Sequence, residues 1–168
     1  MTYCITITTI DYMKILMDSD CLIKITKSGL KKIVCKNFNV TIPSRVKEEV
    51  VSAGIKHDYK DAYVIDSNIR NGLIEVERQK SKFKKGEQQI LNIFQSKKYD
   101  AVATDDSRFI KILKMANIYY IIPSVLIVLL FNRGIINFEE ACKKLEDLAS
   151  FISDDEYMAA RIFLEGKK

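Results

Sequence analysis

Two pairs of acidic residues each follow a short apolar stretch of the chain, in a pattern that suits metal-assisted chemistry. Asp18 and Asp20 follow the letters MKILM, and Asp105 and Asp106 follow AVAT. Both stretches have the length and composition of buried strands. Because the carboxyl ends of neighbouring parallel strands meet at one edge of a sheet, we expect these acids to lie close together. Carboxylates held this close repel one another, and a divalent cation relieves the repulsion.

Three more acids stand where predicted helices begin. Glu48 and Glu49 lie in the first turns of a helix expected after FNVTIP, and Glu87 opens a helix expected at 86–98. Any one of these acids can be explained by local structure, because acids favour the N-terminal ends of helices. Together they offer hard oxygen ligands, which select Mg²⁺ or Mn²⁺. Such an ion polarises a phosphodiester and lowers the pKa of a bound water, so the acids predict metal-dependent hydrolysis.

Short apolar strands alternate along the chain with amphipathic helices. Strands are expected at 13–17, 38–43, 72–78, 100–106 and 118–123, and helices at 21–32, 45–54, 58–70, 86–98, 107–117, 125–134, 138–151 and after 153. This order predicts an α/β fold, a three-layer α/β/α sandwich with a central parallel sheet. Ligands of such sheets bind beyond the carboxyl ends of the strands, where the acids are expected.

The length of 168 residues suits a single domain that spans 1–168. Residues 1–12 are interpreted either as an extra edge strand or as an N-terminal extension, and 136–168 as C-terminal helices. The apolar run at 125–131 is expected in the core, with a dimer interface as the alternative. Three helix starts carry capping residues, with a capping box predicted in the first and the last: Ser44 with Glu48, Asn137, and Ser153 with Glu156.

The composition is that of an ordinary soluble globular protein, with 48% hydrophobic and 29% charged residues. A net charge of +5 permits a polyanionic partner but does not require one. No apolar run has the length of a membrane span and no signal peptide is indicated, so a cytoplasmic protein is expected. The four cysteines lack metal-site spacing and are interpreted as small apolar residues: Cys4, Cys21, Cys35 and Cys142. The only histidine, His57, is expected at the surface.

Four segments, taken in order, resemble a PIN-domain ribonuclease: ILMDSDCLI, TIPSRVKEEVV, GEQQILNIF and AVATDDSRF. In that family an apolar strand ends in an Asp, and an apolar segment with Pro leads into a helix that bears a Glu. A further acid opens a later helix, and a T-x-D motif ends the fourth strand. The resemblance covers 13–135 and extends weakly into the helix that follows. It implies metal-dependent cleavage of RNA, frequently by the toxin of a toxin–antitoxin pair and frequently by a homodimer.

The resemblance also implies catalytic roles for individual acids. Asp18 and Asp106 match acids that bind the Mg²⁺ or Mn²⁺ ion directly. Glu87 matches the acid that completes the coordination. Glu49 matches the helix Glu, which holds a water or a second ion, with Glu48 as the alternative.

Three neighbouring residues extend this set. Asp105 is expected to join Asp106 as a metal ligand, and Thr104 to orient Asp106 or the scissile phosphate. Asp20 stands where family members commonly have Asn or Ser. It is interpreted as an extra ligand or as a residue that rigidifies the loop, so the number of metal ions stays open.

A basic segment, RQKSKFKKG, comes directly before Glu87. Four of its lysines are expected to bind RNA phosphates, and Phe83 is available to stack on a base: Lys80, Lys82, Lys84 and Lys85. A solvated lysine-rich loop explains the same letters equally well.

Three alternatives remain open at this point. ILMDSD and ATDD also fit a phosphatase of the haloacid dehalogenase type, with Asp18 as nucleophile, although Glu49 and Glu87 would then have no role. A PIN-like domain without catalytic activity, acting as an RNA-binding or interaction module, is the second. A receiver domain is the third, but it lacks a clear phosphate-accepting Asp.

Overall fold

The computed structural model describes residues 13–78, 86–96 and 99–167, and its centre is a sheet of five strands. Every strand pairing is parallel, and the order across the sheet is β3-β2-β1-β4-β5. The strands are β1 (Lys14–Met17), β2 (Asn39–Pro43), β3 (Glu75–Glu77), β4 (Ala101–Ala103) and β5 (Tyr120–Ile121). The predicted α/β/α sandwich with a central parallel sheet is therefore confirmed.

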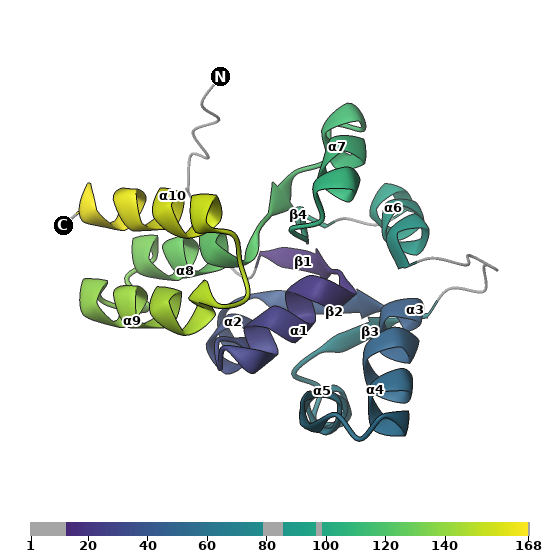
Figure 1. Cartoon of the computed structure of the whole chain (residues 1–168). Coiled ribbons are helices and arrows are strands. Elements are labelled where there is room, and N and C mark those ends of the chain that lie inside the picture. The colour runs from purple at the N-terminus through teal and green to yellow at the C-terminus, as the bar shows by residue number, and fades with distance from the viewer. Residues whose placement is uncertain (1–12, 79–85, 97–98, 168) are drawn as a thin grey trace.

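Helices cover both faces of this sheet (Figure 1). They are α1 (Ser19–Lys27), α2 (Lys31–Asn37), α3 (Ser44–Lys47), the π turn η1 (Glu48–Ser52), α4 (Ala53–Lys56), α5 (Lys60–Arg70), α6 (Gly86–Ser96), α7 (Ser107–Met115), α8 (Pro123–Asn132), α9 (Phe138–Ala149) and α10 (Asp154–Glu165). In Figure 1, α6 and α7 lie on one side of the central strands, and α1 lies on the other. The three C-terminal helices pack together as a group beside β1 and α1.

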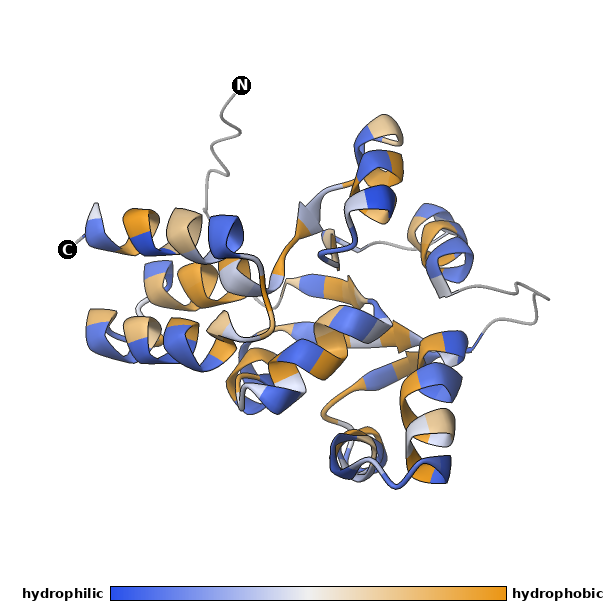
Figure 2. Ribbon diagram, in the orientation of Figure 1, coloured by the Kyte–Doolittle hydropathy of each residue, from blue (hydrophilic) through white to orange (hydrophobic). Residues whose placement is uncertain are grey.

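Alternation along β1 creates two apolar cores. Ile15 and Met17 face the core beneath α1, α2, α5 and the C-terminal helices. Leu16 faces the opposite side, where it packs with Ile90 of α6 and Phe109 of α7. Figure 2 shows apolar colour on the strands and on the helix faces turned toward them. Since β1 is buried on both faces, its position between β2 and β4 is strongly fixed.

The prediction of one helix at 21–32 is wrong. The chain forms two helices there, because Gly29 adopts a φ of +69° between the end of α1 and the start of α2. Glycine enters this left-handed region without the steric penalty that a side chain brings, so it ends the first helix.

Two of the predicted helix starts need correction, and one is confirmed. The Asn137 cap is present, and Glu140 completes a capping box with it. Ser44 does not cap a helix, because α3 begins at Ser44 and its N-cap position is Pro43. The Ser44 hydroxyl accepts a hydrogen bond from Gln89 Nε2 at 3.1 Å. Ser153 accepts from the Glu156 N–H, but no capping box forms there. The Glu156 carboxylate instead accepts from the backbone N–H of Ser124.

The apolar run at 125–131 lies mainly in the core as part of α8, as expected. Cys21, Cys35 and Cys142 are free thiols, and His57 is exposed. In the part of the chain that the structure describes, every helix is too short or too polar to cross a membrane. Cys4 and the interpretations of 1–12 lie outside the described residues.

The contact between α4 and α5 gives a test of packing. A Cβ atom added at Gly54 would lie 2.6 Å from Ala62 Cβ, closer than side-chain atoms approach. We therefore predict that Gly54→Ala lowers the free energy of unfolding by about 1–3 kcal/mol, although Ala is the better helix former. Urea unfolding measures this change. Ser52→Ala, at an exposed site two residues earlier, serves as the control, and equal midpoints for the two variants would contradict the packing argument.

Candidate active site

Asp18 lies where β1 ends and α1 begins, and hydrogen bonds fix both of its carboxylate oxygens. Oδ1 accepts from the Cys21 N–H at 2.8 Å, so Asp18 caps α1. Oδ2 accepts from the hydroxyl of Thr104, which follows β4 and is fully buried. The Asp18 N–H donates to Ala103 O at 3.1 Å. These bonds tie the carboxyl ends of the two central strands to each other.

Asp106 is positioned by the same threonine and by the next helix. Its N–H donates to Thr104 Oγ1 at 3.2 Å. Its Oδ1 accepts from the N–H groups of Arg108 and Phe109 at 2.8 and 2.7 Å, so it caps α7. Thr104 therefore lies between Asp18 and Asp106, and contacts both.

Glu49 reaches the same region from the π turn that follows α3. Its Oε2 accepts from the Ser19 hydroxyl at 2.6 Å, and its Oε1 lies 3.4 Å from Arg45 Nε. The backbone of Gly86 passes close by, since a Cβ atom there would lie 3.4 Å from Glu49 Oε2. A single wide turn of this kind changes which side chains face a site, and such turns are frequent at functional sites.

These elements enclose a pocket of about 330 Å³ at the carboxyl edge of the sheet. Five acids line it, together with Ser19, Val46 and Gly86: Asp18, Asp20, Glu49, Glu87 and Asp106. All five acids were predicted from the sequence to be site residues, and the fold brings them to one pocket. Glu48, the alternative to Glu49, does not line this pocket and pairs with Arg45 at 2.9 Å.

Two predicted site residues do not line this pocket, and four others fall in a segment that the structure does not describe. Asp105 does not line the pocket, because its carboxylate pairs with Lys24 of α1. Thr104 lies behind the pocket wall, in contact with Asp18 and Asp106. The expected phosphate-binding residues Lys80, Lys82, Lys84 and Lys85 fall in the segment 79–85, which the structure does not describe.

Residues that support the acids were missed by the sequence analysis. Ser19 holds Glu49, and Gly86 leaves room for it. Gln89 is buried on α6 and joins that helix to α3, accepting from the Arg45 N–H and donating to Ser44. A polar Gln on the apolar side of a predicted helix was the one sequence signal of this junction.

Burial dominates the electrostatics of Asp18. The pKa of Asp18 is raised from 3.8 to about 7; desolvation is the largest cause, and the nearby charges of Asp105 and Asp20 act in the same direction. The hydrogen bonds from Thr104 and Cys21 oppose this shift. A buried carboxyl group among other acids holds its charge more easily when a cation is adjacent, because the cation favours the ionised form.

The donor chemistry of the pocket fits a hard divalent cation. Its ligand atoms are carboxylate and hydroxyl oxygens, without imidazole or thiolate. Across 13–78, 86–96 and 99–167, no three ligand side chains stand close enough to form a ready-made metal cage. Mg²⁺ keeps several of its waters and commonly uses one or two carboxylates, so a wide acidic pocket suits it better than a closed cage.

Comparison with known families agrees with this geometry. A family model described as a PIN domain matches residues 14–164. The chain belongs to the PIN-domain family. PIN domains are typically nucleases that use divalent metals, and membership sets aside the phosphatase and receiver alternatives. No curated protein and no solved structure was found to match the chain.

The raised pKa of Asp18 predicts how the stability of the metal-free PIN domain depends on pH. The folded protein holds a proton up to about pH 7, while the unfolded chain releases it near pH 4. Unfolding free energy therefore falls as pH rises through this window, by an amount on the order of 2–4 kcal/mol. Asp18→Asn cannot lose this proton, so it removes that part of the pH dependence.

Urea unfolding in EDTA at pH 5 and pH 8 measures the effect in both proteins. We expect the variant to be more stable than the wild type at pH 8 and to approach it at pH 5. A constant difference between the two proteins would show that Asp18 does not titrate in this range.

Proposed function

We propose that this PIN domain is a Mg²⁺- or Mn²⁺-dependent endoribonuclease that hydrolyses phosphodiester bonds in RNA. The observation that carries the proposal is the pocket lined by five carboxylates at the carboxyl edge of the sheet. A pocket this acidic repels a phosphate backbone on its own and becomes attractive only when it holds cations. Metal binding and RNA binding are therefore expected to depend on each other.

Each acid has a role in this proposal. Asp18 and Asp106 bind the ion directly, Glu87 completes the coordination, and Asp20 is an extra ligand or stiffens the loop. When bound, the ion neutralises charge on the phosphate and makes a water molecule more acidic. Glu49 would hold a metal-bound water or a second ion.

The hydrogen bonds around the acids support these assignments. Asp18 and Asp106 are held by backbone N–H groups at helix starts, so their carboxylates are fixed before a ligand arrives. Ser19 and Arg45 orient Glu49 in the same way. The attacking water gives up a proton to the solvent as its oxygen bonds to phosphorus, the bond to the leaving ribose oxygen breaks, and that oxygen takes up a proton from the solvent.

RNA is the proposed substrate because the chain carries a positive net charge and because RNA cleavage is typical of the family. The net charge of +5 favours a polyanion in spite of the acidic pocket. Lys80, Lys82, Lys84 and Lys85 remain the predicted phosphate contacts. We also propose that the protein is the toxin of a toxin–antitoxin pair, that it binds an antitoxin protein and that it forms a homodimer. Free thiols at Cys21, Cys35 and Cys142 are consistent with a reducing cytoplasm.

A PIN-like module without catalytic activity is the alternative that one observation favours. The described carboxylates do not form a preassembled cage, which is also the expectation for a site that has lost its metal. Direct measurement of Mn²⁺ binding separates the two proposals, because only the enzyme requires the ion in this pocket.

Asp18→Asn tests the enzymatic proposal. The variant keeps the cap of α1, because an Asn side chain also accepts from the Cys21 N–H, but it loses the charge that binds the ion. We predict that cleavage of a labelled single-stranded RNA in Mg²⁺ or Mn²⁺ falls at least about a thousandfold, with an unchanged circular dichroism spectrum.

Glu139→Gln, an exposed acid in the first turn of α9, is the matched control and retains full activity. EDTA abolishes cleavage by the wild type. Metal-independent cleavage, or full activity of Asp18→Asn, would refute the proposal. Hydrolysis of p-nitrophenyl phosphate but not of RNA would assign the pocket to another reaction.

A further inference from the structure

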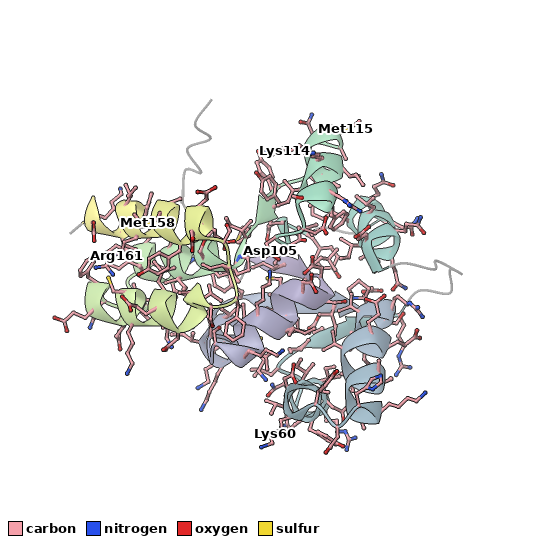
Figure 3. All side chains as sticks on the ribbon, viewed as in Figure 1. Lys60, Asp105, Lys114, Met115, Met158 and Arg161 are labelled. Carbon is pink, nitrogen blue, oxygen red and sulfur yellow. The ribbon has the colours of Figure 1, made fainter. Side chains whose placement is uncertain are left out.

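Asp105 stands beside the proposed catalytic residues but is turned away from them. Its carboxylate pairs with Lys24 Nζ, from the middle of α1, and both side chains are largely buried, at 13% and 26% exposure. Of its neighbours, Thr104 donates to the pocket acid Asp18 and Asp106 lines the pocket itself. Figure 3 places Asp105 between the C-terminal helices and α1. The two adjacent acids therefore face different surroundings: Asp106 lines the pocket, and Asp105 lies outside it.

Lys24 lies in a strongly acidic environment. Burial lowers its pKa, but the bond to Asp105 and the charges of Asp20 and Glu156 outweigh burial and raise it. Glu156 of α10 is itself fixed by the backbone N–H of Ser124 at 2.9 Å, so the C-terminal helices are held against this cluster. Lys24 thus meets acids from α1, from the loop after β4 and from α10.

We propose that Lys24 is a positioning residue that neutralises Asp105 and holds it out of the metal pocket. This inference rests on the proposed function, since it concerns how the same pocket keeps its charge and ligand set. The pair joins α1 to the loop after β4, two segments separated by 81 positions in the sequence.

The place of Asp105 in the chain explains why the direction of its carboxylate matters for the pocket. It lies between Thr104, which bonds to Asp18, and Asp106, which lines the pocket. Without Lys24, a sixth carboxylate is released next to five others. It would then offer a further ligand to a cation in the pocket and pull on the loop that carries Asp106, which caps α7. We therefore expect tighter binding of the cation together with slower cleavage.

The experiment compares Lys24→Met, Asp105→Asn and the double variant with the wild type. Mn²⁺ binding is measured by titration calorimetry at low ionic strength, and RNA cleavage gives kcat and KM separately. For Lys24→Met we expect about tenfold tighter Mn²⁺ binding, together with a kcat reduced about tenfold to hundredfold and a nearly unchanged KM. In the double variant the stray carboxylate is gone, so both Mn²⁺ affinity and kcat return close to those of the wild type.

Two controls separate this role from simple stabilisation. Lys24→Arg keeps the charge and the pairing and retains activity. Lys27→Met removes an exposed lysine from the same helix and changes neither Mn²⁺ affinity nor kcat. Urea unfolding of each variant gives the folded fraction by which kcat is corrected.

The outcomes are distinct. Unchanged Mn²⁺ affinity in Lys24→Met would overturn the proposal, as would a loss of kcat that Asp105→Asn does not restore. If the wild type cleaves no RNA, the proposed function fails. The Mn²⁺ titrations of the single and double variants then still decide whether Lys24 keeps Asp105 out of the pocket.

Discussion

The buried carboxylate of Asp18 is the constraint on which the rest of the site depends. It is bonded at once to the first turn of α1 and to Thr104 after β4, so three elements meet at one side chain. The Asp18 N–H continues the bonding between the two strands to Ala103. Neither oxygen can move without loosening a helix cap or a strand end. The neighbouring acids are placed relative to this fixed point, because Asp106 is bonded through Thr104 and Glu49 through Ser19.

This arrangement opposes stability in the absence of a cation. A carboxyl group buried by apolar strands keeps its proton more readily, and the nearby charges of Asp105 and Asp20 make its ionisation harder. The two apolar cores on either face of β1 supply the stability that holds the acids together. Arg45 pairs with Glu49 and Lys24 pairs with Asp105, so two acids at or near the pocket have a basic partner.

The sheet and the acids were predictable from the sequence, and the contacts that select among the acids were not. Apolar strands ending in acids, such as MKILM before Asp18, indicate a parallel sheet with acids at one edge by local pattern alone. Glu49 and Glu48 look equivalent in the sequence, and only the π turn decides which of them enters the pocket. Asp105 and Asp106 are equally ambiguous, because the partner that draws Asp105 away lies on α1. The break at Gly29 was readable, since glycine after a helix is a known terminator.

Ion pairs outside the pocket accompany both outcomes. Asp105 pairs with Lys24 outside the pocket, while Asp106 faces the cavity. Glu48 pairs with Arg45 outside the pocket, and the same arginine also lies 3.4 Å from Oε1 of Glu49, which faces the cavity. A surface ion pair such as Arg45–Glu48 contributes little to stability. The ion pair instead affects where negative charge lies, because an acid that is neutralised outside the pocket adds less negative charge to the pocket. Lys24 and Arg45 therefore lower the uncompensated negative charge at and around the pocket.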